Sequence, residues 1–160
     1  MTDARSRSIQ AVSNRRLYAA LLCLLLAACA SHPPPVVDFH TREIVLETAL
    51  GQIGRPYRYG GGDGDGFDCS GLVRYVYDQA GVNLPRTAHE QLDLGRSIPF
   101  VDAAPGDLVF YRFDGQLHVT IYVGDGRVVH APSSGQDVTV STVEGDYWSG
   151  RLVKVVRILR

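Results

Sequence analysis

The sequence predicts an α+β domain in which helices come first and antiparallel strands follow. Between residues 41 and 92, apolar side chains recur at helical spacing, together with two helix-capping signals. From Pro105 onward the chain instead holds short runs rich in valine, isoleucine and tyrosine. Gly124-Asp125-Gly126 is a strong turn signal between two of these runs. Helices followed by strands that tight turns connect are typical of the α+β class.

Three helices are expected before the strands. The first covers Thr41 to Ile53, with its opening threonine as the N-cap. Residues 54–66 then hold too many glycines for a regular element and form a loop. Asp68 is placed to cap a second helix, which ends at Gly81. The segment Thr87-Ala88-His89-Glu90 has the capping-box pattern and opens a short third helix.

Strands are expected in the second half of the chain. Each is a run of β-branched and aromatic residues, a composition that suits a pleated, half-buried surface. The five expected strands are Asp107 to Tyr111, His118 to Val123, Arg127 to His130, Val138 to Ser141 and Leu152 to Leu159.

The first 28 residues are expected to be a targeting segment. Four arginines precede an uncharged apolar run, Leu17 to Ala30, which is shorter than the roughly 20 residues of a membrane-spanning helix. A basic stretch followed by a short apolar run is typical of a secretory signal peptide. The run contains Leu26-Ala27-Ala28-Cys29, which resembles the bacterial lipobox. We therefore expect cleavage before Cys29 and lipidation of Cys29. The alternatives are an ordinary signal peptide with an incidental cysteine, or a retained membrane anchor.

The cleaved chain is expected to hold a linker and one domain. Residues 29–40 form the lipidated N-terminus and a linker stiffened by Pro33-Pro34-Pro35, and residues 41–160 form the domain. Several acyl chains on Cys29 would anchor the protein stably to a membrane. Because no aspartate follows Cys29 directly, the lipoprotein-sorting pattern of enteric bacteria implies the outer membrane, facing the periplasm, in a double-membraned host.

Charge and composition exclude some classes of protein. The chain of 160 residues carries 16 Lys+Arg and 17 Asp+Glu, and this net charge of −1 argues against a nucleic-acid-binding protein. Hydrophobic residues at 45% and charged residues at 21% fit a globular domain and argue against a disordered chain. Loss of residues 1–28 removes four arginines and one aspartate, so the mature chain is more acidic.

The three cysteines need separate explanations, because an odd number excludes a fully paired set of intramolecular disulfides. They are also too few and too far apart for a cysteine-rich zinc site. Cys23 leaves with the signal peptide, and Cys29 carries lipid. Cys69 falls in the first turn of the second helix, where backbone N–H groups and the helix dipole favour a thiolate and lower the thiol pKa. Cys69 is therefore a candidate nucleophile, and the alternative is a buried, inert cysteine.

A thiol nucleophile needs a base, and the base needs an orienting partner. His118 begins one expected strand and His130 ends the next. A loop with an odd number of residues, such as Gly124-Asp125-Gly126, would place both on one face as diagonal neighbours. A two-residue Asp125-Gly126 turn would put them on opposite faces. A catalytic triad therefore predicts the loop with an odd number of residues. The alternatives are a structural pair of histidines or a partial metal site, for which no third ligand stands at a convincing spacing.

Six segments, spread over nearly all of residues 41–160, carry a family resemblance: Pro56-Tyr57-Arg58-Tyr59-Gly60-Gly61, Asp68-Cys69-Ser70-Gly71-Leu72-Val73, Leu84-Pro85-Arg86-Thr87, Pro105-Gly106-Asp107-Leu108-Val109-Phe110, His118-Val119-Thr120-Ile121-Tyr122 and His130-Ala131. In this order they resemble the NlpC/P60 family, papain-like cysteine peptidases of bacterial cell walls. The chain is most similar to the small lipoprotein members that have no separate binding domain. The resemblance implies a papain-like NlpC/P60 fold, with N-terminal helices packed on a central antiparallel sheet of about five or six strands.

The resemblance also implies roles for four residues. Cys69 matches the nucleophile, and His118 matches the general base, which takes the thiol proton and later protonates the leaving amine. His130 matches the third residue, which orients the imidazole of His118. Tyr57 matches a tyrosine whose hydroxyl faces the oxyanion, with the backbone N–H of Cys69 as a second donor.

Asp68 and Ser70 match positions that, in some relatives, contact the free amine of the first stem-peptide residue. Those relatives use an extra domain that we do not expect in this protein, and helix capping is the alternative role for Asp68. Asp63, Asp65 and Asp68 could suggest a calcium loop, but they lack the later bidentate glutamate of an EF-hand. We therefore expect no metal and no cofactor.

The function expected from the resemblance is hydrolysis of peptide bonds in peptidoglycan stem peptides or cross-links. The protein is expected to be a monomer held on the membrane by its lipid, with peptidoglycan as substrate and no nucleic-acid partner. Two alternatives are left open. One is a papain-like amidase or acyltransferase, and the other is a non-catalytic envelope lipoprotein that binds peptidoglycan.

Overall fold

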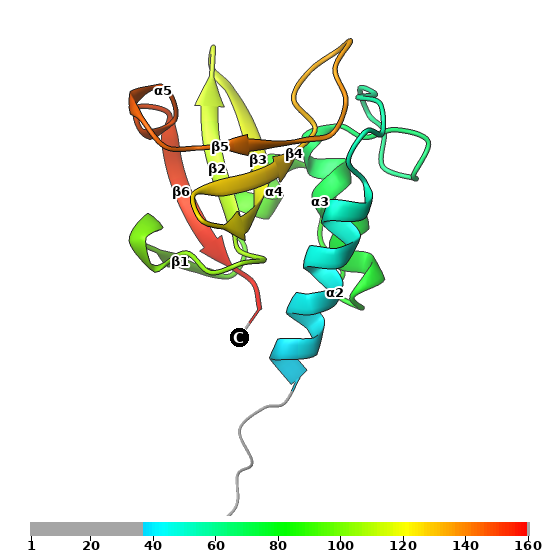
Figure 1. Cartoon of the computed structure of the whole chain (residues 1–160), viewed down its shortest axis with the longest axis horizontal. Helices are drawn as coiled ribbons and strands as arrows, with labels where there is room; N and C mark the ends of the chain where they lie inside the picture. Colours follow the sequence, from blue (N-terminus) through cyan, green and yellow to red (C-terminus); the bar gives the residue numbers. More distant parts are fainter. Residues whose placement is uncertain (1–36, 160) are drawn as a thin grey trace, which may run out of the picture. The chain divides into compact units, whose positions relative to one another are not determined.

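An antiparallel six-stranded sheet forms the centre of the part of the chain that the computed structural model describes, residues 37–159 (Figure 1). Its strand order is β1-β6-β2-β3-β4-β5. The strands are β1 (Arg96–Ile98), β2 (Leu108–Phe113), β3 (Gln116–Gly124), β4 (Arg127–His130), β5 (Thr139–Thr142) and β6 (Leu152–Arg157). The expected signal peptide, the lipobox with Cys29, and the proline-rich segment lie outside the described residues.

The sheet confirms the expected α+β class and contains all five expected strands, with ends displaced by a few residues. The sixth strand, β1, was not anticipated. It is only three residues long, two of them exposed, so its sequence shows too little alternation to indicate a strand. It forms because β6 supplies a partner, with Arg96 opposite Arg157 and Ile98 opposite Val155.

Among the described residues, the three expected helices precede the strands, and the first two of them lie beside the sheet (Figure 1). The first, α2 (Val37–Gly51), begins four residues before the expected start at Thr41, so the end of the expected linker is helical. Placing an N-cap at Thr41 was therefore wrong, and residues 37–40 contain no glycine or proline that would interrupt a helix. No helix within residues 37–159 is long and apolar enough to cross a membrane.

The other two expected helices are confirmed with their caps. In α3 (Cys69–Gln79), the Asp68 carboxylate accepts a hydrogen bond from the Gly71 backbone N–H at 2.7 Å. In α4 (Ala88–Leu92), Thr87 and Glu90 form both bonds of a capping box. Two short elements were not anticipated: a 3₁₀ turn, η1 (Phe100–Asp102), and α5 (Asp146–Ser149). Elements this short have no periodicity that a sequence could display.

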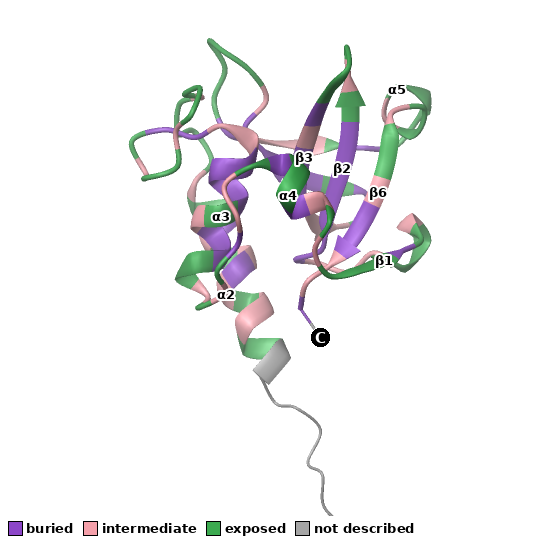
Figure 2. Cartoon of the chain, turned by 180° about the vertical axis from the view of Figure 1, so that it is seen from behind, coloured by how far each residue is buried: buried purple, intermediate pink, exposed green. Residues whose placement is uncertain are grey.

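Alternation along the strands produces two apolar clusters. In β2, the side chains of Leu108 and Phe110 join the larger cluster, which also includes buried residues of α2 and α3. The intervening Val109 and Tyr111 join a smaller cluster on the other face. All four side chains are buried, and Figure 2 shows the corresponding buried stretch of β2. The sheet thus has an apolar layer on each face.

The glycine-rich loop packs tightly against the start of α3. A Cβ on Gly71 would overlap the carbonyl oxygen of Gly61, so only glycine fits at this point of the helix. The same carbonyl accepts a hydrogen bond from the Asp68 N–H at 3.2 Å. A bridge between Tyr57 and Phe67 closes the loop on itself. These contacts hold Tyr57 beside the residue that begins α3.

The turn between β3 and β4 differs from the expected three-residue loop. Gly124 pairs with Arg127, which leaves only Asp125 and Gly126 in the turn. Their φ angles are 53° and 64°, as in a type I′ hairpin turn. The pairing register shifts between Tyr122 and Gly124, which indicates a β-bulge.

The bulge restores the arrangement that a two-residue turn alone would have broken. Tyr122 pairs directly with Val128. His118 lies four residues before Tyr122, and His130 lies two residues after Val128, so both histidines project from one face. The expected juxtaposition is therefore confirmed, although the expected turn was wrong. One extra residue in the strand replaces the extra residue in the loop.

Candidate active site

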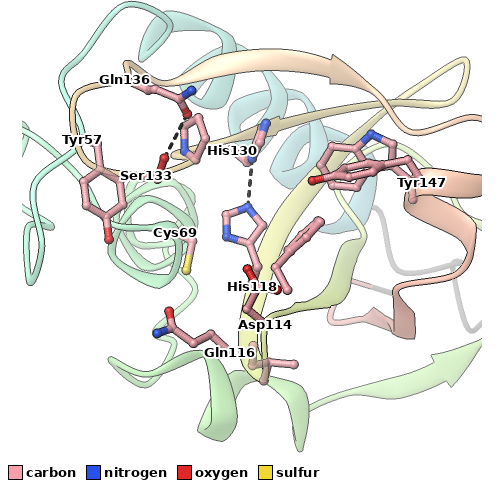
Figure 3. A pocket seen from close by; sticks show the side chains of 13 residues that line it. Tyr57, Cys69, Asp114, Gln116, His118, His130, Ser133, Gln136 and Tyr147 are labelled. Atoms are coloured by element: carbon pink, nitrogen blue, oxygen red, sulfur yellow. Dashed lines mark hydrogen bonds between the residues drawn. The ribbon is translucent and has the colours of Figure 1, made fainter.

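A cavity of about 540 Å³ collects the four residues that the resemblance marks as catalytic. Tyr57 comes from the loop before α3, Cys69 from the first turn of α3, His118 from β3 and His130 from the end of β4 (Figure 3). They are up to 73 positions apart in the chain. Packing of the helices on the sheet is what brings them together.

Cys69 is the first residue of α3, and its sulfur points toward the cavity (Figure 3). Burial raises the pKa of its thiol, and the nearby Asp68 carboxylate adds to this effect. Backbone N–H groups of Val119, Ser70 and Cys69 itself act in the opposite direction. The pKa is raised overall, so the expectation of a lowered value was wrong. Burial of the sulfur outweighs the favourable field at the helix N-terminus.

His118 and His130 are joined directly. Nε2 of His118 lies 2.9 Å from Nδ1 of His130, and Nε2 of His130 lies 2.9 Å from the Ser141 hydroxyl. The remaining ring nitrogen of His118, Nδ1, lies on the side of Cys69 (Figure 3). Among the described residues, no hydrogen bond joins the Cys69 sulfur to this ring. Such contacts are often long in substrate-free enzymes and shorten when substrate binds.

Both imidazoles are held in their neutral form. Burial, and then the neighbouring His130, lowers the pKa of His118 to about 3. Burial lowers the pKa of His130 to about 4. Aromatic rings contribute to this burial: Phe113 lies edge-on to His118 and Trp148 edge-on to His130, each at 5.8 Å between ring centroids. At neutral pH the site therefore contains a thiol and two neutral imidazoles.

Tyr57 presents a neutral phenol to the same cavity. Burial raises its pKa, and so do the nearby Cys69 and Asp68. Its backbone is held from two sides, because its N–H donates to the Gln136 carbonyl at 2.8 Å and it bridges to Phe67. A phenol that keeps its proton at neutral pH is suited to donating a hydrogen bond.

Asp68 and Ser70 face an internal network and do not line the cavity around Cys69. The Asp68 carboxylate accepts hydrogen bonds from the Gly71 and Gly60 N–H groups, and from Arg86 at 2.6 and 3.0 Å. Arg86 also donates to the Ser70 hydroxyl at 3.0 Å. The structure thus confirms the capping role of Asp68, and contact of Asp68 and Ser70 with substrate stays a prediction.

The hydrogen bonds to Asp68 also keep it charged. Burial alone would raise its pKa, but the bonds from Arg86, Gly71 and Gly60 together outweigh burial, so the pKa is lowered. The charged carboxylate is thereby fixed between the glycine loop and the helix that begins at Cys69.

Several residues of the site were missed from the sequence. The motif Leu84-Pro85-Arg86-Thr87 does not indicate a role for Arg86, because the partner of Arg86 lies 18 positions away in the chain. Phe113 and Trp148 gave no signal, since isolated aromatic residues usually indicate core. Ser141 ends an expected strand, and nothing local relates it to His130.

Within residues 37–159, no group of three or more His, Cys, Asp or Glu side chains is arranged to hold a metal ion.

Comparisons with known proteins agree with this geometry. The family model described as "NlpC/P60 family" matches residues 54–157. The chain is 38% identical to murein DD-endopeptidase MepH of Escherichia coli over 124 residues, which cover 73% of this chain and 46% of MepH. It is 42% identical to the bifunctional muramidase/DL-endopeptidase CwlT of Bacillus subtilis over 127 residues, covering 76% of this chain and 37% of CwlT. The chain therefore spans less than half the length of these two relatives.

A solved structure shows the same fold. The P60 domain of an antigen from Mycobacterium avium subspecies paratuberculosis superposes with a TM-score of 0.66 at 37% identity. The superposition covers 76% of this chain and 96% of that domain. Together, the matched segment of sequence, the shared fold and the arrangement of Cys69, His118 and His130 show that the chain belongs to the NlpC/P60 family.

Proposed function

We propose that this protein is a cysteine-type peptidoglycan endopeptidase. The observation that carries the proposal is the bonded pair of His118 and His130 in one cavity with Cys69, the only cysteine of the described residues. Relatives named as murein and peptidoglycan endopeptidases support the substrate class. A thiol, a base and a residue that orients the base are the groups that nucleophilic hydrolysis of an amide needs.

The first half of the reaction forms an acyl-enzyme. With Nε2 of His118 engaged by His130, Nδ1 is the nitrogen available to take the Cys69 proton. The sulfur attacks the carbonyl carbon as this proton leaves. Burial raises the pKa of the Cys69 thiol and lowers the pKa of His118, so burial favours the neutral form of both groups before substrate binds. The protonated His118 then gives its proton to the leaving amine, and the peptide C–N bond breaks.

The second half releases the product. Water enters the cavity and loses a proton to His118 as it attacks the thioester, and the Cys69 sulfur leaves with that proton. In both halves a negative oxygen develops at the attacked carbonyl. The Tyr57 hydroxyl and the Cys69 backbone N–H are the donors proposed to stabilise it.

The proposed substrates are the peptides of murein, cleaved within a stem or at a cross-link. A single experiment tests activity and identifies the bond. The full-length protein in detergent is incubated with purified muropeptides, and the products are read by mass spectrometry beside Cys69→Ser and His89→Ala. His89 is exposed on α4, away from the cavity, and serves as the matched control.

Cleavage by the wild type and His89→Ala, and none by Cys69→Ser, would support the proposal. Hydrolysis of an amide bond that does not join two amino acids, or transfer of an acyl group, would instead support the amidase or acyltransferase alternative. Equal inertness of all three proteins toward every muropeptide would overturn the enzymatic assignment.

We also propose that Cys29 carries lipid and that the enzyme faces the periplasm from the outer membrane. The support is the lipobox resemblance at residues 26–29. The domain suits such an anchor, because α2 begins at one end while the hairpin after β2 and the loop after β4 lie at the other (Figures 1 and 2). These two segments supply cavity residues Asp114 and Gln136.

Metabolic labelling with an alkyne-modified palmitate and membrane fractionation test the anchor, with Cys29→Ser as the variant that should lose both label and membrane association.

A further inference from the structure

His130 makes a second hydrogen bond that the proposed mechanism has not used. Its Nδ1 faces His118, and its Nε2 lies 2.9 Å from the Ser141 hydroxyl oxygen. Both ring nitrogens of His130 are therefore engaged, one by each neighbour. His130 is one of only a few polar or charged buried side chains among the described residues, so the partner of each nitrogen matters for its protonation.

Strand register places the three groups in a row across β3, β4 and β5. Ser141 pairs with Val128, and His130 pairs with Thr139. Ser141 lies two positions after Thr139, so Ser141 and His130 project from the same face of the sheet, as His118 does. Each side chain meets the next diagonally across one strand boundary.

The direction of these hydrogen bonds decides whether His118 can act as a base. If Nδ1 of His118 is to accept a proton from Cys69, its single proton must sit on Nε2 and be donated to Nδ1 of His130. His130 must then carry its own proton on Nε2 and donate it to Ser141.

The reverse direction is unproductive. If Ser141 donates to Nε2 of His130, the proton of His130 sits on Nδ1 and is donated to His118. The proton of His118 then sits on Nδ1, facing Cys69, and that nitrogen cannot accept another proton. Once His118 has taken the thiol proton, both its nitrogens are donors, and only the direction that ends on Ser141 as acceptor is possible.

We propose that Ser141 is a positioning residue for the reaction, which accepts the His130 Nε2–H and so holds His130 in the tautomer that accepts from His118. The proposal rests on the proposed peptidase function and names a further residue of the same site. Ser141 does not line the cavity around Cys69 and therefore acts through His130.

A second cavity explains how a hydroxyl can fill this role. It measures about 530 Å³, and His130 and Ser141 both line it. Water in that cavity can take the hydroxyl hydrogen of Ser141, which leaves the oxygen to accept from His130. Thr139, directly opposite His130, does not compete, because its hydroxyl donates to the Val140 carbonyl at 3.4 Å.

The experiment compares Ser141→Ala with Ser141→Thr, which keeps the hydroxyl, and with Thr139→Val, which removes a hydroxyl from the same strand and face. We expect Ser141→Ala to lower kcat on a muropeptide about three- to tenfold, the value of one hydrogen bond, with KM within twofold. Ser141→Thr and Thr139→Val should stay within twofold of the wild type in both constants.

A second readout does not depend on activity. Long-range ¹H–¹⁵N correlation spectra of the full-length protein report which ring nitrogen of His130 is protonated. The wild type, Ser141→Thr and Thr139→Val should show the Nε2–H tautomer, and Ser141→Ala should show a mixture. A wild type with His130 protonated on Nδ1, or a Ser141→Ala variant with unchanged kcat and tautomer, would overturn the proposal. If the wild type cleaves no muropeptide, the proposed function fails, and the tautomer populations still decide the role of Ser141.

Discussion

Nε2 of His118 lies 2.9 Å from Nδ1 of His130 across a hairpin whose turn has two residues and whose strand contains a bulge. The bulge between Tyr122 and Gly124 is what keeps the two rings on one face. The contact leaves only Nδ1 of His118 for Cys69, so one hydrogen bond selects both the nitrogen that would take the thiol proton in the proposed reaction and the plane in which the ring is held.

Loss of the hydrogen-bond acceptor on His130 should lower the rate of the chemical step more than it weakens substrate binding. We expect His130→Ala to lower kcat on the order of 10²-fold, because His118 loses the partner that orients it. His130→Asn should retain more activity, since an amide oxygen can accept from His118. Steady-state kinetics on one muropeptide measure both variants. His89→Ala is the control, and an unchanged kcat in His130→Ala would contradict the assignment of the third residue.

The same two histidines should make stability depend on pH below neutrality. Their pKa values are lowered from 6.5 to about 3 and about 4, so between these values and 6.5 the unfolded chain binds protons that the folded chain excludes. The contribution of the two histidines to the free energy of unfolding is therefore fully present above pH 6.5. Below pH 6.5 it falls on acidification, by roughly 1.4 kcal/mol for each histidine and each pH unit.

Urea denaturation at pH 7.5, 6 and 5 measures this dependence. A His118→Gln/His130→Gln double variant removes the two titrating groups and should lose less stability than the wild type over the same range. If the two proteins showed the same decline with pH, the buried histidines would not be its source.

The Tyr57 hydroxyl should contribute to the rate rather than to folding. We expect Tyr57→Phe to lower kcat by about 10²-fold, as removal of one oxyanion donor does, with KM and thermal stability nearly unchanged. Tyr59→Phe removes the same atom from a side chain that is 92% exposed, and it should leave kcat unaltered. Equal rates for Tyr57→Phe and the wild type would exclude the phenol from the oxyanion site.

The bond between Arg86 and Asp68 should be structural, in contrast to an exposed ion pair of the same type. Arg86→Gln removes two charge-assisted bonds to the half-buried Asp68 carboxylate, and the free energy of unfolding should fall by about 2 kcal/mol. Arg127 pairs with Asp125 at the exposed hairpin, so Arg127→Gln should lower the free energy of unfolding by less than about 0.5 kcal/mol.

Chemical denaturation at neutral pH compares these two variants. The ordering is the test: if Arg127→Gln proved as destabilising as Arg86→Gln, the network around Asp68 would add nothing beyond an ordinary surface pair. Arg86→Gln should also raise the pKa of Asp68, which ¹³C chemical shifts of the carboxyl carbon can follow.

Local features of the fold could be predicted because they depend on a few neighbouring residues. The cap at Asp68 and the capping box at Thr87 involve residues three apart, and both formed as expected. The strand at 96–98 and the helix at 146–149 could not be predicted, because each is shorter than one reliable period and depends on packing against distant segments. The start of α2 was predicted four residues late, because Thr41 has the preference of an N-cap residue, and an interior threonine is tolerated when tertiary contacts support the helix.

The composition of the candidate site could be predicted, and its chemistry only in part. The motifs predict Cys69, His118, His130 and Tyr57, and the structure brings all four into one cavity. The sequence alone favoured a lowered thiol pKa at the helix start, but the folded protein buries the sulfur, and burial has the larger effect. A helix N-terminus is local and can be seen in a sequence, whereas desolvation depends on every segment that covers the site.

The sequence by itself determined the order and type of most elements, the candidate residues for nucleophilic chemistry, and the family to which the chain belongs. These follow from periodicity, caps and short motifs, which act over a few residues. The tertiary structure decided that a β-bulge places His118 and His130 on one face of the sheet. It also decided that Arg86 donates hydrogen bonds to Asp68 and that Ser141 lies within hydrogen-bonding distance of His130. Burial in the folded protein keeps the thiol and the two imidazoles neutral. Each of these depends on strand register or on burial by distant segments, and neither quantity is encoded in any short stretch of chain.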